Sequence, residues 1–213
     1  MEFIPAPQVL AAYTAAALVL IFTPGADMTF FLGQTLAGGR ARGFAAMLGV
    51  STGVVVHSLA AAFGLSALLA ASATAFGLLK IAGVAYLLWL ALGALRHGSA
   101  LTLKDEAAPA QPLSRAFLKG LMINLLNPKI IVFFLTFLPQ FVSVSDPHAG
   151  GKLLFFGLYF VTLGLPCCAL LILIAERFTA AIHRSPRAMR GIDYLFATLM
   201  GAFAARLLFA RAD

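Results

Sequence analysis

An acidic side chain, Asp27, lies inside a long apolar run, directly after the sequence Thr23-Pro24-Gly25. Proline lacks a backbone donor and glycine tolerates unusual dihedral angles, so a helix containing this sequence is expected to be interrupted there. Within a membrane, the backbone groups freed by such a break must be satisfied by protein or by a watery cavity. A carboxylate beside an interrupted membrane helix therefore indicates a site for a proton or for a substrate's ammonium group.

A basic side chain, Lys129, has a similar setting in the second half of the chain, directly after Asn127-Pro128. Asn124 and Asn127 fall on one face of a helix, where they would either line a site or bond neighbouring helices. Opposite charges beside two interrupted helices suit a zwitterionic amino acid, whose ammonium group can meet Asp27 while its carboxylate meets Lys129. The structural alternative is a permanent salt bridge between the two halves of the chain.

His57 is the third titratable group expected inside the membrane. Histidine titrates near neutrality and could relay protons, or it could form an interhelical hydrogen bond; both interpretations stay open. Of the charged pair, Asp27 is the expected proton carrier. The sequence lacks a GxxxxGK[ST] phosphate loop, an HExxH motif and a cysteine–histidine cluster, so we expect no ATP hydrolysis, metal, cofactor or enzymatic activity. The adjacent Cys167 and Cys168 are interpreted as small packing residues.

The composition predicts an integral membrane protein made of helices. Of the 213 residues, 62% are hydrophobic and 11% are charged, against roughly 25% charged residues in soluble domains. The length predicts a single transmembrane domain over residues 1–213, and no cleavable signal is expected before the first span. The net charge of +7 comes mainly from short loops between apolar spans, which favours a role in membrane orientation over nucleic-acid binding.

The spacing of charges and turns predicts six membrane spans, at about residues 9–33, 43–71, 75–96, 115–141, 151–175 and 191–210. The apolar stretch from Gly43 to Leu95 would make a rod of about 80 Å, so it must fold back near residues 71–77. The polar segment 97–114 is expected to be a solvated cytoplasmic loop. A short basic segment, 176–190, is expected to link the last two spans.

The positive charges divide unequally between the two sides that six spans create. The side of the loops after spans one, three and five holds ten of the 15 lysines and arginines: Arg40, Arg42, Arg96, Lys104, Arg115, Lys119, Arg177, Arg184, Arg187 and Arg190. The other side holds Lys80, Lys152, Arg206 and Arg211. The positive-inside rule places the richer side in the cytoplasm and both termini outside it.

The two halves of the chain, residues 1–96 and 115–213, would enter the membrane from opposite sides. If they share ancestry they form an inverted repeat of three helices each, with interruptions in helices one and four. Pro24 and Pro128 fall in corresponding spans, each beside a charge and each followed by Phe-Phe-Leu. Paired interruptions of this kind indicate the binding site of a secondary transporter.

Helical rise places both intramembrane charges at similar depth. Lys129 lies roughly 15 Å along the helix from Lys119, and Asp27 lies about 20 Å from Arg40, in a hydrocarbon core about 30 Å thick. Because either charge alone would be costly at that depth, each is expected to have a partner, which is the other charge or a ligand.

Several segments together resemble the lysine-exporter superfamily, specifically its homoserine/threonine efflux (LysE/RhtB-type) branch. They are TPGAD at 23–27, GVSTGVVVH at 49–57, LKIAGVAYLL at 79–88, NLLNPK at 124–129 and FLPQF at 137–141. The resemblance covers nearly the whole chain. Ala26 departs from the family pattern, which commonly has a second proline at that position.

The resemblance implies a multi-pass protein of the bacterial inner membrane that exports amino acids or their derivatives, of the homoserine, threonine, leucine or lysine class. Transport would be driven by protons, with the zwitterion bound at the midplane. The competing hypothesis is a non-transporting membrane scaffold or assembly factor whose intramembrane charge pair is structural. The sequence leaves the transported compound and the oligomeric state open, a homodimer included.

Overall fold

The structure is a computed structural model that describes residues 5–65, 73–97, 112–142 and 146–209, and every regular element within those residues is helical. The α-helices are α1 (Pro7–Phe22), α2 (Ala26–Ala60), α4 (Ala73–His97), α5 (Leu113–Leu125), α6 (Pro128–Val132), α7 (Ala149–Leu173), α8 (Ala175–Arg184) and α9 (Pro186–Phe209). A π-helical turn, Ala61–Leu65, extends α2, and a π-helical turn (Phe133–Phe137) and a 3-10 turn (Leu138–Phe141) extend α6.

The first interruption separates α1 from α2 at the predicted place. Gly25 there is fully extended, with φ −170° and ψ −175°. Helix α2 itself reverses direction at Gly39, which has φ 81° and is the one glycine with positive φ in the described chain. A Cβ atom on Gly43 would lie 2.0 Å from the Thr35 hydroxyl, although eight residues of straight helix span about 12 Å. The chain therefore makes a helical hairpin at Gly39, between the predicted spans 9–33 and 43–71.

The second interruption separates α5 from α6, and the two segments meet at a bend of 50°. Pro128 occupies the first turn of α6, where its missing N–H costs nothing. The side chain of Asn127 caps this helix by accepting a hydrogen bond of 3.0 Å from the backbone N–H of Lys129. The break thus combines a proline that cannot continue α5 with an asparagine that starts α6.

By length and composition, two stretches of the described chain are long enough to cross a membrane, and the bent pair could be a third: Ala26–Gly64, Ala149–Leu173, and Leu113–Leu125 with Pro128–Phe141. Two further helical segments are apolar but shorter: Pro7–Phe22 and Ile81–Arg96. The first of the long stretches includes the reversal at Gly39. The all-helical class is therefore confirmed, whereas the arrangement of six spans as inverted repeats stays a prediction.

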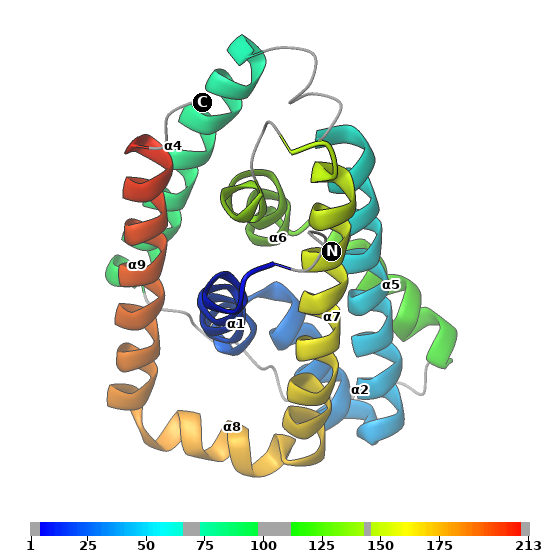
Figure 1. Ribbon diagram of the computed structural model, residues 1–213. Coiled ribbons are helices and arrows are strands. Elements are labelled where there is room, and N and C mark those ends of the chain that lie inside the picture. Colours follow the sequence, from blue (N-terminus) through cyan, green and yellow to red (C-terminus); the bar gives the residue numbers. More distant parts are fainter. Residues whose placement is uncertain (1–4, 66–72, 98–111, 143–145, 210–213) are drawn as a thin grey trace.

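The segment that was expected to link the last two spans is helical. The basic segment 176–190 was expected to join the last two spans as a short connection, but it forms α8 and the start of α9, with Ser185 between them. Figure 1 shows α8 as a bar that joins the lower ends of α7 and α9. The predicted loop 97–114 lies largely outside the described residues, at 98–111. Of the predicted turn near residues 71–77, residues 71 and 72 also lie outside them, and the rest forms the start of α4.

Helices α2 and α5 form a close interface. A Cβ atom on Gly49 would lie 2.0 Å from the carbonyl oxygen of Phe117, and one on Gly120 would lie 2.4 Å from the carbonyl oxygen of Ala46. The contacts advance together along both sequences, from Gly49 to Gly53 on α2 and onward along α5, so the two segments run parallel. Small residues let the backbones approach this closely.

The remaining helices enclose α1 and α6. Figure 1 shows α4 and α9 side by side along one edge, with α2, α5 and α7 on the other side and α1 and α6 near the centre. An aromatic core packs beside α1: the buried Tyr13 donates a hydrogen bond of 2.8 Å to the carbonyl oxygen of Phe156 and contacts the rings of Phe133 and Phe137. The two helix interruptions therefore lie inside the molecule.

Candidate functional site

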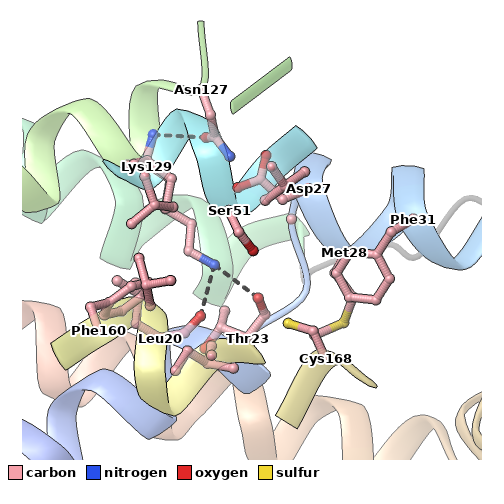
Figure 2. Close-up of a pocket in the computed structure, with 17 residues that line it drawn as sticks. Leu20, Thr23, Asp27, Met28, Phe31, Ser51, Asn127, Lys129, Phe160 and Cys168 are labelled. Atoms are coloured by element: carbon pink, nitrogen blue, oxygen red, sulfur yellow. Dashed lines mark hydrogen bonds between the residues drawn. The ribbon is translucent and has the colours of Figure 1, made fainter. Parts of the chain in front are cut away.

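The ammonium group of Lys129 occupies the first helix interruption. Pro24 has no N–H with which to continue the helical pattern onto the carbonyl oxygen of Leu20. Lys129 Nζ donates to that oxygen at 3.1 Å and to the carbonyl oxygen of Thr23 at 2.8 Å (Figure 2). A cation is also favourable at the carboxyl end of α1, where the helix dipole is negative. An ammonium group has three donors, so one has no oxygen acceptor among the described residues, and the ring of Phe196 lies 5.7 Å from Nζ.

The Asp27 carboxylate lies in the first turn of α2 and contacts the end of α5. Asn124 Nδ2 donates to Asp27 Oδ2 at 2.8 Å, and the Asn124 side chain is completely buried. The other carboxylate oxygen, Oδ1, is buried and has no hydrogen-bond partner among the described residues. The amide of Asn127 adds to the polar surroundings of the carboxylate, and Figure 2 shows the two side chains facing each other. A buried, unpaired carboxylate oxygen is costly, which indicates a group that binds a partner.

His57 lies at the second interruption. Pro128 lacks the N–H that would bond the carbonyl oxygen of Asn124, and His57 Nε2 lies 3.4 Å from that oxygen. The imidazole ring also stacks on Phe134, with 5.7 Å between the ring centroids. The contact joins α2 to α5, as expected for an interhelical hydrogen bond; the alternative of a proton relay stays a hypothesis.

A charged side chain next to each helix interruption contacts the other interruption. Asp27 and Lys129 each occupy the second position of the helix that follows a break, and each side chain contacts the end of the helix that precedes the other break. This arrangement brings the first and second halves of the chain together around one point.

Asp27 and Lys129 do not form a direct ion pair. An ion pair joins Lys152 to Asp146 instead, at the start of α7. Each of the two intramembrane charges instead contacts neutral polar groups. The two charges are therefore not each other's partner: backbone and amide groups contact both, one carboxylate oxygen is left over, and a ligand as the partner stays a prediction.

A cavity of about 70 Å³ separates the two charges. Both charged residues line it, together with Thr23, Gly25, Ser51 and Asn127, and the rest of its wall is mainly apolar: Leu20, Ile21, Met28, Phe31, Val50, Val54, Ile130, Phe160, Val161, Gly164 and Cys168. Figure 2 shows the Lys129 ammonium group and the Asp27 carboxylate on either side of Ser51. The wall draws on α1, α2, α6 and α7, so the cavity lies between elements of both halves.

The structure gathers most of the predicted site residues but gives them different positions. Asp27, Lys129 and Asn127 line the cavity, whereas Asn124 lies behind Asp27 and bonds it. His57 lines a separate cavity of about 240 Å³ with Ala60, Ala61, Gly64, Ile131, Phe134 and Leu135. No sequence pattern distinguishes Ser51, which is one more small polar residue in an apolar helix.

Cys168 is another wall residue that was not predicted to belong to the site. It lines the cavity from α7, whereas Cys167 does not. Only the rotation of α7 distinguishes the two cysteines, and adjacent identical residues carry no signal for it. Among the described residues, no group of three or more histidine, cysteine, aspartate or glutamate side chains could hold a metal ion.

Comparison with known proteins gives a family for the chain. The model of the LysE type translocator family matches residues 18–211. The chain is similar to the homoserine/homoserine lactone efflux protein of Salmonella typhimurium, with 30% identity over 200 residues that cover 94% of this chain and 96% of the relative. It is also similar to the leucine efflux protein of Salmonella choleraesuis, with 28% identity over 197 residues and 92% of each chain covered.

An uncharacterized membrane protein of Vibrio cholerae is 32% identical over 196 residues, which cover 88% of this chain and 90% of the relative. No solved structure matches the chain. The family match spans nearly the whole sequence and includes both helix interruptions. This chain is a membrane protein that belongs to the LysE-type translocator family.

Proposed function

We propose that this protein is a secondary exporter of amino acids or their derivatives, with the cavity between Asp27 and Lys129 as its substrate site. One observation carries the proposal: a buried, unpaired carboxylate oxygen and an ammonium group with an unused donor flank the same cavity. The relatives named as homoserine and leucine efflux proteins support the transported class.

The free groups match the two ends of a zwitterion. The substrate ammonium would donate to Asp27 Oδ1, which has no other hydrogen-bond partner among the described residues. The substrate carboxylate would accept the remaining donor of Lys129. At about 70 Å³ the cavity is far smaller than a usual ligand pocket of roughly 300–1,000 Å³. Substrate binding would therefore require the helices around the cavity to separate, as alternating access demands.

In the proposed transport cycle, the two halves of the chain move relative to each other, and each half has three spans. They would be inverted repeats in the bacterial inner membrane, with the arginine-rich side in the cytoplasm and both termini outside. The reciprocal contacts of the two breaks support such a relation between the halves. Export would be driven by the proton gradient, with Asp27 exchanging a proton for the substrate ammonium.

The competing proposal, a non-transporting scaffold, rests on the same bonds. The contacts of Lys129 with the carboxyl end of α1 and of Asn124 with Asp27 hold the two halves together. A scaffold, however, gives no reason for an unpaired carboxylate oxygen beside a cavity. The exporter accounts for both features, and we therefore favour it.

Counterflow in proteoliposomes distinguishes the two proposals. Vesicles loaded with unlabelled leucine or homoserine are diluted into the same amino acid carrying a radioactive label, with and without an imposed pH gradient. The exporter predicts transient accumulation of label that empty vesicles lack, and a change in rate when the gradient is imposed. A scaffold predicts no flux of any amino acid in either condition.

A further inference from the structure

We infer that the cavity selects amino acids with uncharged side chains and rejects cationic and anionic ones. This inference rests on the proposed function and narrows it, because an exporter of the LysE-type family could take lysine as well as the uncharged amino acids in the relatives' names. Two properties of the wall support the inference: among the described residues it holds only two charged side chains, and most of the rest is apolar.

The wall contains one acid and one base, Asp27 and Lys129, with no further formally charged side chain. Both are used by the α-ammonium and α-carboxylate groups that every amino acid carries. A lysine substrate would bring a second ammonium group with no second carboxylate to meet it, and a glutamate substrate would bring a second carboxylate with no second cation. An unpaired charge at such depth is strongly disfavoured.

Neither His57 nor Lys119 supplies the missing partner. His57 lines the other cavity, behind the Asn124 carbonyl group. The nearest basic residue on α5, Lys119, lies over the ring of Phe30 at 5.8 Å and is exposed. Neither side chain belongs to the wall of the cavity between the two charges.

Apolar side chains cover the wall beyond the two charges. Figure 2 shows Met28 and Phe31 of α2 near Cys168 of α7 on one side, and Phe160 of α7 near Leu20 of α1 on the other. A substrate side chain that leaves the charged end of the cavity enters this surface. Burial of aliphatic groups there is favourable at roughly 25 cal/mol per Å², whereas a polar group without a partner loses free energy.

A panel of competitors tests the inference on the wild-type protein. Counterflow of labelled leucine is measured in proteoliposomes against unlabelled leucine, valine, lysine and glutamate. We expect leucine and valine to compete, and lysine and glutamate to compete on the order of 100-fold less well. Competition or exchange by lysine within tenfold of leucine would overturn the inference while leaving the exporter proposal intact. Absence of flux for every amino acid would instead remove the exporter proposal and the inference with it.

The two adjacent cysteines provide a matched pair of variants. Cys168→Asp adds a second acid to the wall, and Cys167→Asp adds the same charge at a position outside it. Lysine exchange relative to leucine exchange should rise at least tenfold in Cys168→Asp and stay unchanged in Cys167→Asp. An equal change in both variants would contradict the inference. If either variant fails to accumulate in the membrane, the wild-type panel decides alone.

Discussion

Each proline at a helix interruption leaves a carbonyl oxygen without its usual donor, and a charged or titratable side chain from the other half lies at that oxygen. Lys129 bonds the Leu20 carbonyl oxygen freed by Pro24, and His57 lies near the Asn124 carbonyl oxygen, which loses the Pro128 donor but accepts the backbone N–H of Asn127 at 3.0 Å. Within a membrane, such carbonyl groups have no water to bind. The side chains that stabilise the breaks are therefore next to the groups proposed to bind substrate.

Replacing Lys129 by methionine should lower stability as well as transport. The change leaves the carbonyl oxygens of Leu20 and Thr23 without their donor, a loss of about 1–3 kcal/mol in the free energy of unfolding. Thermal unfolding of the purified protein in detergent measures the effect.

Lys119→Met is the matched control, because the exposed Lys119 makes only a cation–π contact with Phe30 among the interactions described for it. This variant should unfold within about 1 kcal/mol of the wild type. Equal unfolding temperatures for Lys129→Met and the wild type would show that the two carbonyl bonds do not hold the break.

The sequence points to the charged residues of the candidate site and to Asn124 and Asn127, but not to Ser51 or Cys168. Asp27 and Lys129 stand out because charges are rare in apolar spans, and the adjacent prolines indicate where the backbone must change direction. Ser51 and Cys168 could not be identified, because their position in the wall depends on how α2 and α7 are rotated in the packed protein. That rotation follows from tertiary contacts.

Helices α2 and α5 pack so closely that a larger side chain at their contact would clash with the backbone of the other helix. Gly49 and Gly120 let each backbone lie against a carbonyl group of the other helix. Asn124 of α5 and His57 of α2 lie farther along the same interface. The position of Asn124 beside Asp27 therefore depends on how closely these two helices pack.

Gly120→Ala should destabilise the protein by about 1–3 kcal/mol, because the new Cβ atom would lie 2.4 Å from the backbone oxygen of Ala46. Gly201→Ala in α9 is the control: a Cβ atom there meets none of the described atoms within 4 Å, and alanine favours helix. The yield of folded protein and its thermal unfolding in detergent measure both. A fully stable Gly120→Ala variant would contradict the close approach of α2 and α5.

Sequence patterns predicted some elements better than others. The interruptions and the hairpin at Gly39 were predicted because proline and glycine act locally on the backbone. The helical state of α8 was missed, because a short basic segment between apolar spans has the composition of a loop. Here the pairing of helices, such as α4 with α9, depends on contacts between distant segments, which no single-sequence pattern reports.

At the scale of the whole molecule, the orientation of the chain rests on the distribution of lysine and arginine. Two to three candidate spans follow from the lengths of the described helices, and the proposal of six requires α1, α4 and α9 to cross as well. The proposed direction of transport depends on this orientation, because the cytoplasmic side must be the side from which substrate enters.

Reporter fusions test that orientation. Alkaline phosphatase, which folds only where disulfides form, should be active when fused after residue 213 and inactive when fused after residue 104. A fluorescent protein that folds in the cytoplasm should give the opposite result at the two sites. The reverse pattern would place the arginine-rich side outside the cytoplasm and contradict the proposed topology.

The measurement that tests the central claim most directly is binding of labelled leucine and homoserine to the purified protein, compared between the wild type, Asp27→Asn and Asp146→Asn. Both variants replace a carboxylate by an amide, but Asp146 pairs with Lys152 outside the cavity. We predict saturable binding to the wild type and to Asp146→Asn, and at least about 100-fold weaker binding to Asp27→Asn. Equal binding to all three proteins, or no binding of either amino acid to the wild type, would contradict the claim that the cavity between Asp27 and Lys129 holds the substrate.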